Sequence, residues 1–399
     1  MKTQWKTTKG DYYEKHILFC LVFVILMLST VLASCNVNTT PHEHSFDEII
    51  TPPTYTNEGY TTNTCECGYS YKDEYVSVPT PSEGLEYELN EDGVSYSVKG
   101  IGTCDDTFVV IPSVYENLPV TGISKYAFCE QVLVENIVIP DSVTSIGHYA
   151  FKDCKSLVSI AIPDSVMDFG GSVFYGCTNV KSIFLGSGIT KITNHTYVDT
   201  VIVSGISFPI LQECTSFPFY DCVSLETVKF SESISEIGAY VFSECDSLKN
   251  ILVDEKNEHY RSIDGNLYSK KGETLVCYAK GKNETSFAVP DFVMYIGENA
   301  FLNCETLTNV SIGNSTKIIG KYAFTNCTSL TSITIPTSVI CIEKYALSDC
   351  TSLTTINWEG TVLEWKGVDF KERWSFVTGE FTIYCTDGTI ARDGTVTYK

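Results

Sequence analysis

One feature limits the fold of this chain more than any other, namely a set of cysteines that recur every 23 residues. Cys154 and Cys177 are separated by this interval, and so are Cys222 and Cys245. Further along the chain the same interval separates Cys304, Cys327 and Cys350. A fixed period of this length is typical of a stack of similar turns, because one turn alone cannot bury its apolar edge.

Apolar residues follow each of these cysteines at fixed distances and predict a short strand. After Cys154 they are Leu157, Ile160 and Ile162. The last two alternate with small or polar residues, which turns one face of the strand inward. We therefore predict a β-dominated repeat solenoid of the α/β type over residues 83–399. It should contain one parallel sheet and about ten turns of 23 residues.

Three intervals between equivalent strand ends, 112–140, 186–231 and 254–290, are longer than 23 residues. The two with the largest excess must leave the stack as insertions, near residues 194–216 and 255–285. The second insertion carries the turn signals Asp264-Gly265 and Lys271-Gly272 between residues that favour strands. A dipeptide such as Asp-Gly is a strong indicator of a tight turn between antiparallel strands. We therefore expect a hairpin there.

The N-terminus has the pattern of a signal peptide. Four lysines precede an apolar run over residues 17–28, and Leu32-Ala33-Ser34-Cys35 follows shortly after it. This ending resembles the lipobox of bacterial lipoproteins, and the resemblance implies that residues 1–34 are removed and that Cys35 is lipidated. The alternatives are an uncleaved membrane anchor and a plain signal peptide. We expect an extracellular protein whose contact with the membrane is the lipid anchor alone, because no second apolar run is long enough to span it.

A small spacer and linker, residues 35–82, separates this signal from the repeats. Its two histidines, His42 and His44, and its two cysteines, Cys65 and Cys67, have the donor types of a tetrahedral zinc site. The alternative is a small β-rich spacer in which the two cysteines are free or oxidised. No other cofactor is indicated.

The repeat cysteines are interpreted as structural. Equivalent positions in successive turns point inward, so these residues should form a ladder of buried free thiols. A disulfide between consecutive turns is the alternative, because the spacing of neighbouring strands allows it. Outside this register, Cys104 and Cys129 are candidates for a bridge near the start of the stack.

Residues 137–154, Ile-Val-Ile-Pro-Asp-Ser-Val-Thr-Ser-Ile-Gly-His-Tyr-Ala-Phe-Lys-Asp-Cys, resemble the BspA-like subclass of leucine-rich repeats. The resemblance covers about residues 85–399. It implies a surface protein of a bacterium that adheres to host proteins, host cells or other microbes. Members also occur in mucosal parasites, and two sequons, at Asn283 and Asn314, fit that alternative source.

Composition and motifs narrow the range of functions that the chain can have. A formal net charge of −22 does not suit a nucleic-acid binder, which needs a basic face for phosphate. The six histidines are scattered, and the chain contains no nucleophile elbow, P-loop or dinucleotide fingerprint. We therefore expect a binding protein, an adhesin, rather than an enzyme. A non-adhesive scaffold of the cell envelope is the alternative, and a hydrolase is a distant third.

The expected binding surface lies where the repeat permits variation, on outward-facing strand positions. Phe184 is an aromatic residue at such a position, and Lys181, Lys229 and Leu252 are predicted to adjoin it. Together they would form an aromatic and cationic anchor for a host or microbial surface protein or glycan. The alternative is that Phe184 packs beneath the insertion near residues 194–216.

Overall fold

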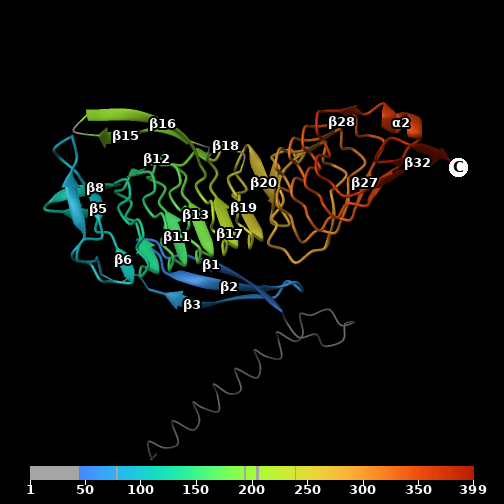
Figure 1. Cartoon of the computed structure of the whole chain (residues 1–399). Coiled ribbons are helices and arrows are strands. Elements are labelled where there is room, and N and C mark those ends of the chain that lie inside the picture. Colours follow the sequence, from blue (N-terminus) through green and yellow to red (C-terminus); the bar gives the residue numbers. More distant parts are fainter. Residues whose placement is uncertain (1–44, 78–79, 193–194, 204–205, 239) are drawn as a thin grey trace, which may run out of the picture. The chain divides into compact units, whose positions relative to one another are not determined.

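The computed structural model describes residues 45–77, 80–192, 195–203, 206–238 and 240–399 (Figure 1). For residues 195–203 and 206–216 only the backbone is described. The predicted lipidation site Cys35 and the predicted zinc ligands His42 and His44 lie outside the described residues.

The segment after residue 45 forms a three-stranded sheet, which we call the N-terminal sheet. Its strands are β1 (Phe46–Thr51), β2 (Gly59–Cys65) and β3 (Ser70–Val76), in the order β1-β2-β3. β2 and β3 are antiparallel, with Thr61 opposite Asp73. Gly59 is required at the start of β2, because a Cβ atom there would lie 2.8 Å from the ring of Pro53.

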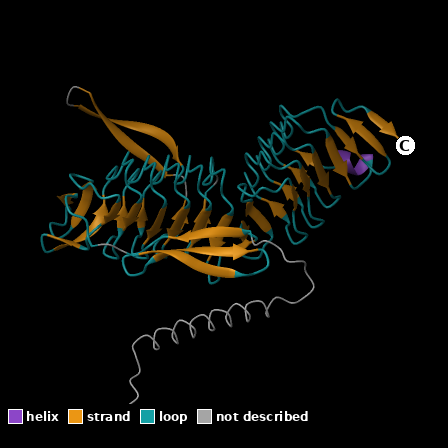
Figure 2. Ribbon diagram, turned by 90° about the horizontal axis from the view of Figure 1, so that it is seen from below, coloured by secondary structure: helices purple, strands orange, loops and turns teal. Residues whose placement is uncertain are grey.

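From residue 108 onward, each turn of the solenoid adds one strand to a parallel ladder (Figure 2). The first ladder consists of β6 (Phe108–Val110), β9 (Asn136–Val138), β11 (Ser159–Ile162), β13 (Ser182–Leu185), β17 (Thr227–Phe230) and β19 (Asn250–Val253). The second ladder consists of β23 (Ser286–Ala288), β25 (Asn309–Ser311), β27 (Ser332–Ile335), β29 (Thr355–Trp358) and β31 (Thr382–Tyr384). Two antiparallel strands, β32 (Gly388–Ala391) and β33 (Val396–Tyr398), extend the second ladder at its far end.

The predicted solenoid of parallel strands is confirmed, but the prediction of one sheet was wrong. Among the described residues the strands of the ladder fall into two sheets, with an interruption between β19 and β23. The physical reason is the insertion at 255–285, whose strands take up the hydrogen-bonding groups next to β19. The N–H of Ile251 in β19, for example, donates to the carbonyl of Gly265 at 2.8 Å.

The number of turns is also slightly larger than predicted. The two ladders contain eleven parallel strands, because β31 adds one after the ten expected from the repeat. β31 belongs to the closing segment, where Tyr384 pairs with Asn357 in the same register as the preceding turns.

A second set of short strands runs along the bend of each turn. In the first half they are β4 (Glu86–Leu89), β5 (Tyr96–Gly100), β7 (Val114–Tyr115), β8 (Leu118–Ile123), β10 (Ser145–Ile146), β12 (Asp168–Phe169), β14 (Lys191–Ile192) and β18 (Glu236–Ile237). In the second half they are β20 (Tyr260–Ile263), β21 (Asn266–Ser269), β22 (Thr274–Cys277), β24 (Tyr295–Ile296), β26 (Ile318–Ile319), β28 (Cys341–Ile342) and β30 (Asp369–Phe370). A short helix, α2 (Val362–Lys366), begins after Thr361, which forms a capping box with Glu364.

Both insertions are antiparallel hairpins. The first pairs β15 (His195–Val203) with β16 (Ile206–Ser216), as Figure 1 shows. The second pairs β20 with β21, which confirms the predicted hairpin. Its turn has Asp264 at φ 48° and Gly265 at φ 72°, the left-handed conformation that a tight two-residue hairpin turn needs.

The core is built from residues that repeat at the same position in every turn. The seven repeat cysteines are free and buried, with at most 1% of their surface exposed, which confirms the interpretation as structural thiols. Six donate a hydrogen bond to the carbonyl of an aromatic residue in the preceding turn, such as Cys154 to Phe128 at 3.0 Å. Cys104 and Cys129 are also free, so the predicted bridge between them was wrong.

The core has two separate clusters, one for each ladder. β21 contributes to both, because neighbouring residues of a strand point to opposite faces. Leu267 is fully buried in the first cluster, and the adjacent Tyr268 is 1% exposed in the second. The second insertion therefore covers the end of both hydrophobic clusters, with Leu267 facing the first and Tyr268 facing the second.

Candidate functional site

The structure brings three of the four predicted binding residues into one row across the first ladder. Phe184 of β13 lies opposite Lys229 of β17, and Lys229 lies opposite Leu252 of β19. Ala161 of β11 continues the row on the other side of Phe184. Equal turns place equivalent positions side by side, so a row of this kind follows from the register of the repeat.

Phe184 and Lys229 form the central contact of this row. The Nζ atom of Lys229 lies 5.5 Å from the centroid of the Phe184 ring, within the range of a cation–π interaction. Lys229 is exposed and Phe184 is half-buried, whereas the neighbouring Ile183 is fully buried in the core. The ring thus lies on the outer face of the strand and is not part of the inner packing.

Lys181 and Leu252 occupy the margins of the row. Lys181 precedes β13 and is exposed, and its carbonyl accepts the N–H groups of Glu226 and Thr227 at 2.9 Å each. Glu226 also forms an ion pair with Lys249, whose Nζ lies 3.1 Å from its carboxylate. Leu252 is half-buried on the last strand of the first ladder.

A small cavity of about 250 Å³ lies near the Ala161 end of the row. Thr54, Thr56 and Asn57, which precede β2, line it together with Ala161 and Pro163. The first insertion, with which Phe184 was alternatively expected to pack, has described backbone only. That alternative therefore remains a prediction.

The predicted zinc ligands are partly outside the described residues. Cys65 ends β2 and is buried, whereas Cys67 lies exposed in the turn that follows. Within the described ranges no group of three or more histidine, cysteine or acidic side chains is placed to hold a metal ion. With His42 and His44 unplaced, the zinc site remains a prediction.

Sequence reasoning missed one cavity, of about 330 Å³, beside the interruption between the two ladders. Tyr240 and Asn299 line opposite walls of this cavity. The signal in the sequence is a departure from the repeat at Asn299. The third residue after the bend isoleucine is a tyrosine in five other turns, namely Tyr126, Tyr149, Tyr240, Tyr322 and Tyr345.

The fold defines a class of protein, the leucine-rich-repeat solenoid. The sequence model described as BspA type leucine rich repeat region matches six copies, over residues 121–249, 200–271 and 276–382. These matches cover more than half of the chain, so the protein belongs to the BspA-type leucine-rich-repeat family.

Solved structures of bacterial repeat proteins are similar to this chain. The pneumococcal vaccine antigen PcpA is 19% identical, with a TM-score of 0.51, and the match covers 79% of this chain and 82% of PcpA. A leucine-rich-repeat protein of Eubacterium ventriosum is 17% identical, with a TM-score of 0.40 and coverage of 72% and 78%. A leucine-rich cell surface protein of Faecalibacterium prausnitzii is 19% identical, with a TM-score of 0.33 and coverage of 73% and 99%.

The likeness to PcpA supports the fold of the solenoid. No curated protein sequence matches the chain. Over the ranges that the structure describes, no helix has the length and apolar character needed to cross a bilayer.

Proposed function

We propose that this chain is a surface-anchored binding protein, an adhesin that contacts host proteins, host cells or other microbes through the outer face of its first ladder. The observation that carries the proposal is the row formed by Phe184, Lys229 and Leu252. It combines an aromatic ring, an exposed cation and an aliphatic side chain on one continuous surface. Aromatic and cationic groups of this kind dominate the energetics of many protein interfaces.

The repeat separates the residues that fold the chain from those that are free to bind. Inward positions such as Ile183 and Val228 are fully buried and must stay apolar to keep the turns stacked. Outward positions of the same strands are not constrained by the core, so they can carry a recognition surface without loss of stability. Family membership supports a binding role and offers no reason to propose catalysis.

The described histidines give no support to an enzymatic role. The Nδ1 atom of His148 accepts the backbone N–H of Gly171 at 2.7 Å, which ties two neighbouring turns together. His259 lies exposed in the second insertion, in a different turn.

The anchor is proposed from the sequence. Lipidation of Cys35 after removal of residues 1–34 would hold the chain at the cell surface and present the solenoid to the outside. Cys35→Ala should then move the protein from the membrane fraction to the medium or leave it unprocessed. A variant that keeps its acyl chains and its membrane location would contradict the proposed anchor.

The proposed adhesion is tested by incubating the purified full chain with an array of host matrix proteins and glycans. Phe184→Ala and Lys229→Ala should each weaken capture of the ligand that the array identifies. Tyr384→Ala is the matched control, because Tyr384 is an outward aromatic residue on the second ladder, 49% exposed and in register with Asn357.

Each outcome of the array decides between functions. Capture that is lost in the two first-ladder variants and kept in Tyr384→Ala supports adhesion through the row. Capture that all three variants retain places the site elsewhere. No capture by the wild-type chain, with the protein firmly bound in the cell envelope, would favour a scaffold.

A further inference from the structure

The starting observation is one turn that is shorter than its neighbours at the bend. In other turns a loop of six residues joins the bend glycine to the repeat cysteine, as from Gly297 to Cys304. The turn that contains β22 lacks this loop, and its chain doubles back at Gly281. A Cβ atom at Gly281 would lie 2.0 Å from the backbone of Ser247, so only glycine allows this close approach.

The short turn is nevertheless stacked between two full-length turns. The N–H of Tyr278 donates to the carbonyl of Ala300, and the N–H of Gly281 donates to the carbonyl of Leu248, both at 2.8 Å. Beyond the short turn the two longer turns meet directly, where the side-chain amide of Asn303 donates to Glu244 at 3.2 Å. The bend therefore contains a recess one turn wide.

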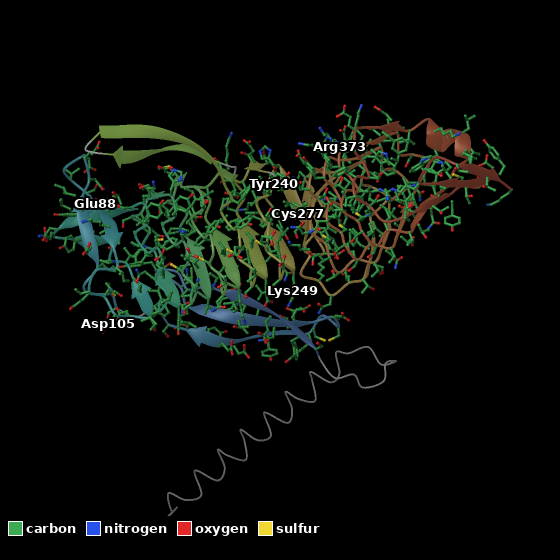
Figure 3. The ribbon with its side chains drawn as sticks, in the orientation of Figure 1. Glu88, Asp105, Tyr240, Lys249, Cys277 and Arg373 are labelled. Atoms are coloured by element: carbon green, nitrogen blue, oxygen red, sulfur yellow. The ribbon has the colours of Figure 1, made fainter. Side chains whose placement is uncertain are left out.

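This recess is the cavity of about 330 Å³. One wall comes from residues 237–243, the other from residues 297–302, and the short turn from Val276 to Tyr278 forms the floor. Figure 3 labels Tyr240 on the first wall and Cys277 on the floor. Most of the lining is aliphatic or aromatic, and the volume is that of a site for a small ligand.

One polar side chain in the lining has no partner. Both polar atoms of the Asn299 side chain, Oδ1 and Nδ2, are buried, and neither makes a hydrogen bond to any described residue. Burial raises the pKa of Tyr240, and the approach of the Asn299 amide to the Tyr240 hydroxyl offsets part of that rise. The approach does not reach the geometry of a hydrogen bond, so the amide stays without a partner. An unpaired buried amide is costly and rare in native structures.

The repeat shows that Asn299 is a departure and not a requirement of the backbone. Asn299 has φ 60°, and the tyrosines at the same position in the two following turns, Tyr322 and Tyr345, have φ 56° and 59°. Those two rings stack with centroids 5.2 Å apart. Replacing the ring by a shorter amide opens the wall of the recess and places an acceptor and a donor there.

We propose that this cavity binds a short apolar segment of a polypeptide. An apolar side chain of the ligand fills the recess, while its backbone N–H donates to Oδ1 of Asn299 and its backbone carbonyl accepts from Nδ2. The N–H and the C=O of one extended residue lie on the same side of the backbone, so they can pair with the Oδ1 acceptor and an Nδ2 donor of one asparagine side chain.

Both charged residues of the lining are paired, which favours a neutral ligand. The carboxylate of Glu298 lies 3.5 Å from the Nζ atom of Lys321. The one lysine that lines the cavity, Lys280, is already paired, with its Nζ atom 2.7 Å from a carboxylate oxygen of Asp246. The ammonium group is therefore not available to attract an anion. This inference concerns a different part of the solenoid from the Phe184 row, and it does not depend on the proposed adhesion.

The test uses the purified full chain and three blocked tripeptides, acetyl-Gly-X-Gly-amide, in which X is leucine, phenylalanine or serine. Binding is measured by isothermal titration calorimetry. The leucine and phenylalanine peptides should bind and the serine peptide should not. Asn299→Gly removes the amide and is tolerated at positive φ, so it should weaken binding about tenfold or more. Asn299→Tyr restores the residue of the repeat and fills the recess, and it should abolish binding.

Asn326→Gly is the matched control, because Asn326 also has φ 60° but its amide is paired with Asn303 at 3.1 Å, away from the cavity. It should bind the peptides as the wild type does. Circular dichroism shows that each variant is folded before titration. Failure of the wild-type chain to bind the two apolar peptides overturns the proposal. So does binding that both Asn299 variants retain, or equal binding of the serine peptide.

Discussion

The Sγ atom of Cys327 lies 3.1 Å from the carbonyl oxygen of Phe301, to which it donates a hydrogen bond across two successive turns. The side chain is 1% exposed and contacts only the core. The thiol thus fills space and also satisfies a backbone acceptor in the turn before it. This double role explains why a cysteine and not an aliphatic residue recurs at the position.

Cys327→Ala should lower the free energy of unfolding by about 1–3 kcal/mol, because it leaves a small void and a buried carbonyl without its donor. Urea denaturation followed by circular dichroism measures the change. Cys104→Ala is the control, since Cys104 is only half-buried and lies outside the repeat register. Equal stability of the two variants would mean that the thiol ladder contributes nothing specific.

Stability should fall as the pH rises above about 8.5, the pKa of an unfolded cysteine. Burial raises the pKa of Cys277 to about 12, and burial also raises the pKa of Cys222 and Cys245. The thiolate is therefore disfavoured in the folded state, so the stabilisation is complete below pH 8.5 and is lost toward pH 12. Each thiol contributes a slope of up to about 1.4 kcal/mol per pH unit.

Urea midpoints measured between pH 7.5 and 9.5 would record this slope before most tyrosines ionise. Cys277→Ala should reduce the slope, because one thiol with a raised pKa is removed. A midpoint that does not change over this range would contradict the assignment of these residues as buried, protonated thiols.

Phe184→Ala and Ile183→Ala should separate recognition from folding. Ile183 is fully buried, so its truncation should cost about 2–5 kcal/mol of stability. Phe184 lies on the outer face, so its truncation should leave the melting temperature nearly unchanged and weaken ligand binding by about 2 kcal/mol. A large loss of stability in Phe184→Ala would show that the ring belongs to the packing.

The N-terminal spacer carries a candidate zinc site in His42, His44, Cys65 and Cys67, which would hold one zinc ion per chain. Elemental analysis of the purified full chain would measure the metal content directly. Cys65→Ser should remove the zinc, whereas Cys104→Ser should not. A wild-type chain without zinc would favour the β-rich spacer whose cysteines are free or oxidised.

Much of the fold could be predicted because the repeat encodes it locally. The residues at fixed distances from Cys154 define both the strand and its buried face, and the Asp264-Gly265 dipeptide defines a hairpin. The row of Phe184, Lys229 and Leu252 follows from register alone. These features depend on residues that are close in sequence or equivalent by the period.

The interruption and the cavity could not be predicted in the same way. Whether an insertion extends a ladder or ends it depends on which segment forms hydrogen bonds with β19. Here Gly265 of the insertion accepts one of those hydrogen bonds. The cavity exists because one turn has fewer residues than its neighbours and leaves a space between them. In the sequence, only Asn299 in place of the repeat tyrosine indicates the cavity. Its role becomes clear only from the positions of residues 237–243 and 297–302, which form the cavity walls.

Leu267 and Tyr268 are neighbours in one strand, but each packs at the end of a different half of the stack. In a repeat array, cooperativity passes from each turn to the next through their shared interface. Where the ladder of backbone hydrogen bonds is interrupted, that transmission is weakened. Under a mechanical load between the termini, the two blocks can therefore yield one after the other, and the chain lengthens in steps while the remaining block stays folded.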